Sequence, residues 1–109
     1  MNSHCVHVDI VLNVSTDEWL RHCQHVVDKF LSVPGLQWKL WLASPASNAA
    51  GGIYLFQDEA SAVAYVGGPV IAALRGNPSV RDVRIRIYAV EEDLSRRTHA
   101  IGASAAHAS

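Results

Sequence analysis

The amino-acid sequence predicts an α+β protein of the ferredoxin-like class, in which a four-stranded antiparallel sheet carries helices on one face. The first observation is a pattern of alternating apolar residues, which predicts strands over residues 6–14, 36–43, 52–56 and 80–90. The second is apolar spacing of three and four residues, which predicts helices over residues 16–31, 59–66 and 69–74. The resulting order, β-α-β-β-α-β with the second helix interrupted, is that of the ferredoxin-like fold.

Length and composition narrow the class of protein. The chain has 109 residues, enough for one domain with its own core; we expect that domain to span residues 1–99 and residues 100–109 to form a frayed tail. The formal net charge of −1 provides no basic field for nucleic acid or anionic lipid, and no apolar run approaches the ~18 residues of a membrane helix. With two cysteines and no secretory signal pattern, we expect a cytoplasmic protein with reduced thiols.

The first strand and helix follow from residues 6–31. The strand face that we expect to be buried consists of Val6, Val8, Ile10, Leu12 and Val14. Ser15 or Thr16 can cap the following helix, because a hydroxyl accepts a hydrogen bond from a free N–H of the first turn. The apolar stripe of that helix consists of Trp19, Cys23, Val26, Val27, Phe30 and Leu31. Pro34-Gly35 ends the helix and turns the chain into the next strand.

The next two strands are predicted to form a hairpin, and strict alternation assigns its side chains to two faces. The face that we expect to pack against the helices holds Leu36, Trp38, Leu40, Leu42, Ile53 and Leu55. The opposite face holds Gln37, Lys39, Trp41, Ala43, Gly52, Tyr54 and Phe56. This second face is too apolar to remain in water, so we expect it to meet a partner subunit or a ligand.

The second half of the chain is punctuated by turn residues. Asp58 is a candidate cap for the helix that follows the hairpin, and the Gly-Gly-Pro sequence at 67–69 divides that helix in two. In the last strand, the side chains expected to face the core are Val83, Ile85 and Ile87. The charged segment 91–99 is expected to lie on a neighbouring subunit.

The sheet face without helices is the predicted dimer surface. Its side chains are expected to be His7, Asp9, Lys39, Trp41, Tyr54, Phe56, Arg84, Arg86 and Tyr88. Two such sheets packed face to face would bury the aromatic rings, and Asp9 could pair with Lys39 or Arg86 at the interface. The sequence therefore predicts a homodimer.

The segments PGLQWKLW, AGGIYLFQDEASAVAYV and YAVEEDLS resemble the YdhR-like monooxygenases of the dimeric α/β-barrel superfamily, and the resemblance covers residues 8–99. It implies a homodimer with a pocket between sheet and helices in each protomer. It also implies cofactor-independent oxygenation of a small aromatic, polyketide-like molecule. The residues carried over by position are Asn13, Trp38, Lys39, Trp41, Gly51, Gly52, Tyr54, Phe56, Asp58 and Glu59.

Cofactor-free oxygenation requires a protein that orients the ring, removes one proton and stabilises an oxyanion. The candidate substrate-binding residues are Trp38, Tyr65 and Leu40, with His22 as the base and Asn13 as a hydrogen-bonding group. Each also has a structural interpretation: Trp38 as plain core, His22 as a solvated helix flank and Asn13 as a turn residue.

We expect no metal and no organic cofactor. His22 and His25 are three residues apart, whereas metal-binding helices more often use a spacing of four. Haem degradation would require a histidine and a tryptophan near the second helix, and residues 58–75 contain neither. Two alternatives remain open: a cyclase or isomerase of a polyketide-like substrate, and a dimer that binds a small molecule without catalysis.

Overall fold

The computed structural model describes residues 2–99, so the predicted tail at 100–109 lies outside the described residues. The elements in chain order are β1 (His4–Leu12), α1 (Thr16–Val26), η1 (Val27–Ser32), β2 (Leu36–Ser44), η2 (Pro45–Ser47), β3 (Ala49–Phe56), α2 (Glu59–Val66), α3 (Pro69–Arg75), β4 (Val80–Ala89) and α4 (Glu92–Arg97), where η marks a 3₁₀-helix. The four strands form one antiparallel sheet in the order β2-β3-β1-β4. This is the predicted ferredoxin-like α+β fold.

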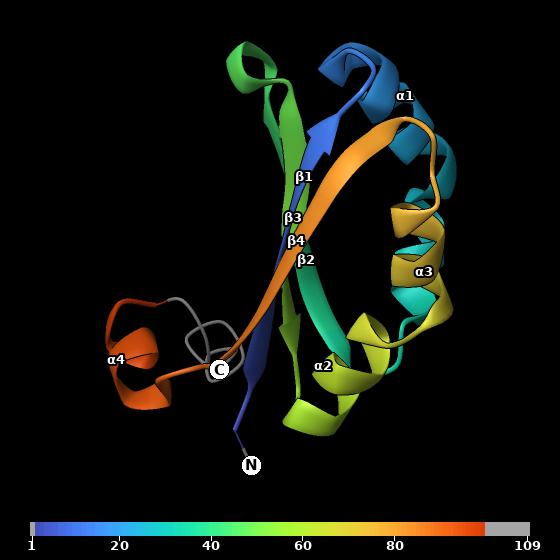
Figure 1. Cartoon of the computed structure of the whole chain (residues 1–109). Coiled ribbons are helices and arrows are strands. Elements are labelled where there is room, and N and C mark those ends of the chain that lie inside the picture. Colours follow the sequence, from blue (N-terminus) through green and yellow to red (C-terminus); the bar gives the residue numbers. More distant parts are fainter. Residues whose placement is uncertain (1, 100–109) are drawn as a thin grey trace.

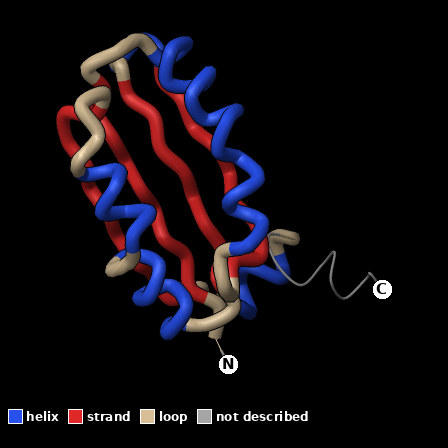
Figure 2. Tube along the Cα trace, turned by 90° about the vertical axis from the view of Figure 1, so that its right-hand side faces the viewer, coloured by secondary structure: helices blue, strands red, loops and turns tan. Residues whose placement is uncertain are grey.

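The helices form a second layer on one face of the sheet. Figure 1 shows α1, α2 and α3 on one side of the strands and α4 on the other. Figure 2, viewed through the helical layer, shows two rows of helices along the sheet. A 2.7 Å hydrogen bond from the Ser3 amide to the Glu92 carboxylate joins α4 to the segment that precedes β1. Within residues 2–99, no helix is both long and apolar enough to cross a membrane.

Two predicted caps start the helices. The Ser15 hydroxyl accepts a hydrogen bond from the Glu18 amide at 3.1 Å, and the Asp58 carboxylate accepts one from the Ser61 amide at 2.8 Å. The predicted continuation of the first helix to Leu31 is wrong, because α1 gives way to the 3₁₀-helix η1 at Val27. The tighter winding of η1 rotates side chains away from the stripe of α1, and Leu31 is 85% exposed.

The predicted faces of β1 and β4 agree with the structure. Val6, Val8 and Ile10 are buried, and they lie opposite Ile87, Ile85 and Val83 of β4. The residues between them, including Arg84, Arg86 and Tyr88, point to the face without helices and are exposed.

The predicted faces of the hairpin are wrong. Tyr54 lies opposite Val6, which is in the core, and Lys39 lies opposite Tyr54. Consequently Lys39, Trp41, Tyr54 and Phe56 face the helices and were wrongly placed on the dimer surface.

The physical reason for this error is a register shift at the start of β2. Leu36 pairs with Phe56 and Trp38 with Leu55, so two residues of β2 oppose one of β3 across Gln37. Leu36 packs against the core as predicted, but the extra residue reverses the faces of the rest of β2. The faces of β3 follow from its unshifted pairing with β1, in which Tyr54 lies opposite Val6, so the rings of Tyr54 and Phe56 take the core positions instead of Ile53 and Leu55.

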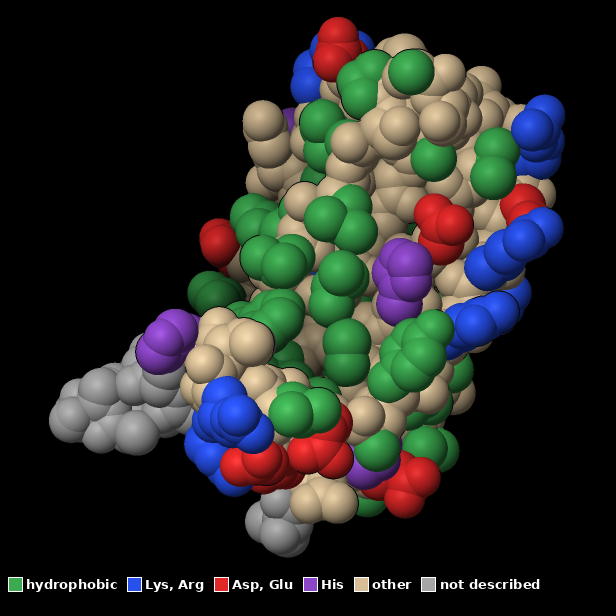
Figure 3. All heavy atoms as spheres, turned by 90° about the vertical axis from the view of Figure 1, so that its left-hand side faces the viewer, with side chains coloured by type: hydrophobic (Ala, Val, Ile, Leu, Met, Phe, Trp, Pro, Cys, Tyr) green, Lys and Arg blue, Asp and Glu red, His purple; other side chains and the backbone are tan. Residues whose placement is uncertain are grey.

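The sheet face opposite α1, α2 and α3, called the open face below, has only the short helix α4 on its side and is strongly apolar. Trp38, Leu40 and Leu42 of β2 are 38%, 51% and 38% exposed, and Tyr88 of β4 adds another large side chain. Figure 3 looks onto this side of the molecule and shows hydrophobic side chains over much of it, with charged groups mainly at the margins. This surface has the composition of one that another molecule covers.

Candidate functional site

A cavity of about 460 Å³ lies between the helix-facing side of the sheet and the helices. This volume lies within the range of small-molecule sites. Exposed residues such as His22, Lys29 and Val70 are part of its lining, so the cavity reaches the surface. Its aromatic walls are Trp19, Phe30, Trp41, Tyr54 and Tyr65.

Lys39 enters this cavity from β2 and ends among three aromatic rings. Its Nζ atom lies 3.3 Å from the ring centroid of Trp41, 3.7 Å from that of Phe30 and 4.6 Å from that of Tyr54. Burial lowers the pKa of Lys39 to about 7. None of the ion pairs formed within residues 2–99 includes Lys39. The side chain is therefore a poorly solvated amine with π faces, but no carboxylate, around it.

Two glycines of β3 occupy positions with no room for a side chain, and one of them lies beside Lys39. Gly51 has a φ of +156°, and a Cβ atom there would collide with the backbone oxygen of Val8. A Cβ atom on Gly52 would lie 2.9 Å from Cε of Lys39 and 3.3 Å from Cε1 of Tyr54. The missing side chain of Gly52 thus leaves the space in which the Lys39 stem lies.

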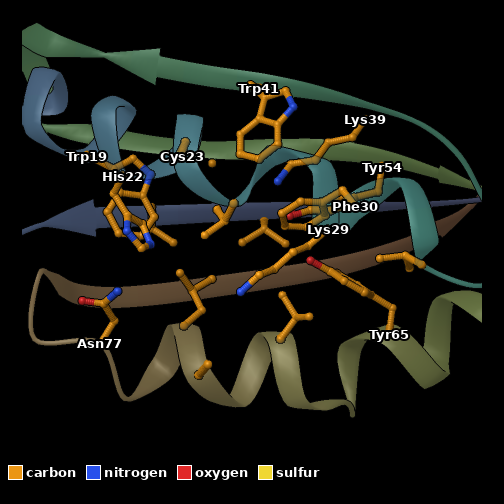
Figure 4. A pocket seen from close by; sticks show the side chains of 18 of the residues that line it. Trp19, His22, Cys23, Lys29, Phe30, Lys39, Trp41, Tyr54, Tyr65 and Asn77 are labelled. Atoms are coloured by element: carbon orange, nitrogen blue, oxygen red, sulfur yellow. The ribbon is translucent and has the colours of Figure 1, made fainter.

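Tyr54 and Tyr65 form the wall beside the amine. Their ring centroids are 4.9 Å apart, and burial raises the pKa of both hydroxyls, so both remain protonated at neutral pH. Within residues 2–99 the buried Tyr65 hydroxyl forms no hydrogen bond of good geometry, although it interacts with the nearby Tyr54 hydroxyl, and Tyr65 as a whole is 7% exposed. Figure 4 shows Lys39 and Tyr65 reaching into the cavity from β2 and α2. An unpaired buried hydroxyl is costly, and a ligand oxygen would satisfy it.

The other end of the cavity is formed by α1 and the loop before β4. His22 lies against Trp19, with ring centroids 5.4 Å apart, and Asn77 lines the cavity nearby (Figure 4). Cys23 is buried in the wall, and burial raises the pKa of its thiol, so it is not a thiolate at neutral pH. Among residues 2–99, no group of three or more His, Cys, Asp or Glu side chains could hold a metal ion.

The sequence-predicted site residues are divided between different places. His22 and Tyr65 line the cavity. Asn13 does not: it is exposed, and its side-chain amide donates to the Pro78 carbonyl at 3.1 Å. Trp38 and Leu40 lie on the open face, because of the register shift in β2.

The sequence pattern assigned the hairpin side of the cavity wall to a dimer surface. Lys39, Trp41 and Tyr54 were recognised as sharing a face, but that face was expected to lie away from the helices. The signal that could have located them is the glycine of β3 opposite Trp41, since a residue without a side chain leaves space above the sheet.

A family model described as "Putative mono-oxygenase ydhR" matches residues 5–101 of this chain. No curated protein matches this chain. Among solved structures, the chain is similar to NE2512, a protein of unknown function from Nitrosomonas europaea, with 18% identity and a TM-score of 0.69 over 84% of this chain and 91% of that one.

Two oxygenases of known structure share the fold. SnoaB, a cofactor-independent oxygenase from Streptomyces nogalater, has 12% identity and a TM-score of 0.64 over 84% of this chain and 96% of SnoaB. A monooxygenase from the gene ActVA-Orf6 of Streptomyces coelicolor, in complex with the ligand Nanaomycin D, has 15% identity and a TM-score of 0.63 over 83% of this chain and 88% of that one. At these identities the likeness concerns the fold alone.

Proposed function

This chain belongs to the ydhR mono-oxygenase family, and from that premise we propose that it is a cofactor-independent monooxygenase whose substrate is a small aromatic, polyketide-like molecule bound in the cavity beneath the helices. The observation that carries the proposal is the cavity itself. It combines aromatic walls with a buried, unpartnered Tyr65 hydroxyl, which suits a planar ring bearing an oxygen substituent.

The chemistry relies on the substrate as the electron source. An activated CH₂ carbon in the ring loses a proton, and the resulting carbanion reduces dioxygen. One oxygen atom of dioxygen becomes the carbonyl oxygen on that carbon, and the other leaves as water. The protein has to orient the ring, accept the proton and stabilise the oxyanion, and the lining of the cavity offers groups for each task.

The proposed assembly is a homodimer formed by two open faces. Its apolar contacts come from Trp38, Leu40, Leu42 and Tyr88, in place of the four hairpin residues that face the helices. The polar side chains of the same face are His7, Asp9, Arg84 and Arg86. The exposed apolar side chains of β2 support this assembly, because an isolated protomer would leave them in water.

Oxygen consumption by metal-free protein with an anthrone or hydroquinone tests the activity. We expect uptake of one dioxygen per quinone formed from an anthrone, and strongly reduced turnover for Trp41→Ala, whose ring lines the cavity. The control is Trp38→Ala, because Trp38 lies on the other side of the sheet. A rearranged product without oxygen uptake would indicate a cyclase or isomerase, and tight binding without turnover across a phenolic panel would indicate a binding protein.

A further inference from the structure

We propose that Lys39 is the proton acceptor of this cavity, and that the cavity selects hydroxy-aromatic compounds acidic enough to be held as anions against the Lys39 ammonium. This inference rests on the proposed function, since it specifies the substrate class and the base of the same site.

The cavity offers positive charge to a ligand. Its titratable side chains are Cys23 and His22 on α1, Lys29 on η1, Lys39 on β2, Tyr54 on β3 and Tyr65 on α2. Among the described residues that line the cavity, none is an aspartate or a glutamate, and α3 contributes only apolar groups. Among the described lining residues, a ligand with a negative charge would therefore meet lysine amines and tyrosine hydroxyls but no repelling carboxylate.

The Lys39 amine occupies an aromatic part of the cavity. It ends among the rings of Phe30, Trp41 and Tyr54, and within residues 2–99 no carboxylate is within 4.0 Å of Nζ. Burial lowers the pKa of Lys39 to about 7, so a large fraction of the protein carries a neutral amine at neutral pH. A neutral amine accepts a proton, and the three π faces stabilise the ammonium that results.

The proton moves from the hydroxyl of the ligand to the amine of Lys39. The phenolic O–H bond of the ligand breaks, a new N–H bond forms on Nζ, and the electron pair of the broken bond remains on the ligand oxygen. A neutral phenol and a neutral amine become a phenolate and an ammonium, which attract one another strongly where the effective dielectric constant is low. The unpartnered Tyr65 hydroxyl can donate a charge-assisted hydrogen bond to the same oxygen.

Lys39 is preferred over His22 because of where each side chain lies. His22 is exposed and stands at the end of the cavity near Trp19. Lys39 lies among the aromatic walls on the same side of the sheet as Tyr54 and Tyr65, where a planar ligand would be held. Removing the hydroxyl proton from the enol form of an anthrone gives the same delocalised anion as removing a proton from its ring CH₂ group, so this single transfer to Lys39 supplies the electron-rich species that reduces dioxygen.

Binding of a coloured phenol tests this inference without any requirement for turnover. The probe is 4-nitro-1-naphthol, whose anion absorbs visible light, and its methyl ether is the matched ligand that has no proton to give. A third ligand, (1-naphthylmethyl)trimethylammonium, tests the opposing possibility that the aromatic rings prefer a cation. The proteins are wild type, Lys39→Met, the control Arg21→Met outside the cavity, and the two comparison variants Lys29→Met and His22→Gln in its lining.

We expect wild type to bind the phenol as its anion, with the visible band appearing at a lower pH than in free solution. The ether should bind at least about tenfold more weakly, which is the loss expected when a charge-assisted hydrogen bond is absent. Below the pH at which the free phenol ionises, Lys39→Met should lose the band and a similar factor in affinity. Arg21→Met should retain both, because Arg21 is exposed and does not line the cavity, and Lys29→Met and His22→Gln should still show the band. Tyr65→Phe should retain the band with affinity reduced several-fold.

Three results would overturn the inference: equal affinity for phenol and ether, an unchanged phenolate band in Lys39→Met, or tighter binding of the cation than of the phenol. Failure of the proposed function looks different. Phenolate binding that depends on Lys39, but without oxygen uptake from any substrate, would refute the monooxygenase and leave the ligand class supported. Oxygen uptake that Lys39→Met does not alter would refute the role of Lys39 and leave the monooxygenase supported.

Discussion

Replacing Lys39 with methionine should stabilise the folded protein at low pH, although the change removes a side chain that contacts three aromatic rings. Methionine keeps a similar length and an apolar stem, so the cavity wall stays filled. What it removes is an ammonium that the fold buries without a carboxylate partner. The expected gain comes from relieving that desolvation.

The magnitude follows from the pKa of Lys39, which burial lowers from 10.5 to about 7. Since one pKa unit corresponds to about 1.4 kcal/mol, holding the proton in the folded state costs up to about 5 kcal/mol. The cavity reaches solvent, and contact with the π faces offsets about 1–2 kcal/mol, so we expect Lys39→Met to gain about 1–3 kcal/mol at about pH 6. Between pH 7 and 10.5 the unfolded chain binds this proton and the folded chain does not, so wild-type stability rises with pH in that window and the advantage of the variant shrinks.

Urea denaturation of wild type and Lys39→Met at about pH 6 and about pH 9.5 measures this difference directly. Lys29→Met is the matched control, because Lys29 is exposed on η1 and its removal should change the free energy of unfolding by less than about 0.5 kcal/mol. A variant that is less stable than wild type at pH 6, or whose advantage is the same at both pH values, would show that Lys39 is not a buried, unpaired amine.

Three further changes test other parts of the structure. Tyr65→Phe removes a buried hydroxyl without a partner, so thermal unfolding should show unchanged stability or a gain of about 1 kcal/mol, and a loss of 2 kcal/mol or more would mean that the hydroxyl is paired. Gly52→Ala places a methyl group 2.9 Å from Cε of Lys39 and 3.0 Å from the Leu40 carbonyl oxygen. Denaturation should therefore show a free energy of unfolding lowered by about 1–3 kcal/mol, and titration with the phenol should show weaker binding. A variant that matches wild type in both measurements would contradict the close packing. Leu40→Glu puts a charge on the open face, so sedimentation at low micromolar concentration should show a monomer, and an intact dimer would refute the proposed interface.

Much of the fold could be predicted because local signals agree with it. Ser15 and Asp58 act as caps where the sequence places them, and the Gly-Gly-Pro sequence at 67–69 separates α2 from α3. The faces of β1 and β4 follow from simple alternation of Val and Ile with polar residues, which a sheet buried on one side requires.

The faces of the hairpin could not be obtained in this way, because a β-bulge leaves no mark in an alternating pattern. Leu36, Trp38 and Leu40 alternate without a break in the sequence, yet the extra residue at Gln37 puts Leu36 on one face and the other two on the opposite face. Lysine is rarely buried, so Lys39 favoured the wrong assignment for its own face. Only the observed pairing of β2 with β3 therefore shows that Lys39, Trp41 and Tyr54 share one cavity.

The candidate site was predictable only in part. His22 borders the stripe of α1 and does line the cavity, as helical spacing suggests. Asn13 was expected at the end of a strand, but β1 ends at Leu12 and the Asn13 amide binds the carbonyl of Pro78. The proximity of Tyr65 to Tyr54 depends on how α2 crosses the sheet, which no local pattern encodes.

The central claim is that ligand binds on the helix-facing side of the sheet, and the three tryptophans of the chain offer a direct test. Trp19 and Trp41 line the cavity, whereas Trp38 lies on the open face. In protein labelled with 5-fluorotryptophan, addition of 4-nitro-1-naphthol should shift the fluorine resonances of Trp19 and Trp41 and leave that of Trp38 unchanged. A ligand that shifts Trp38 and leaves Trp19 and Trp41 unchanged would contradict the account.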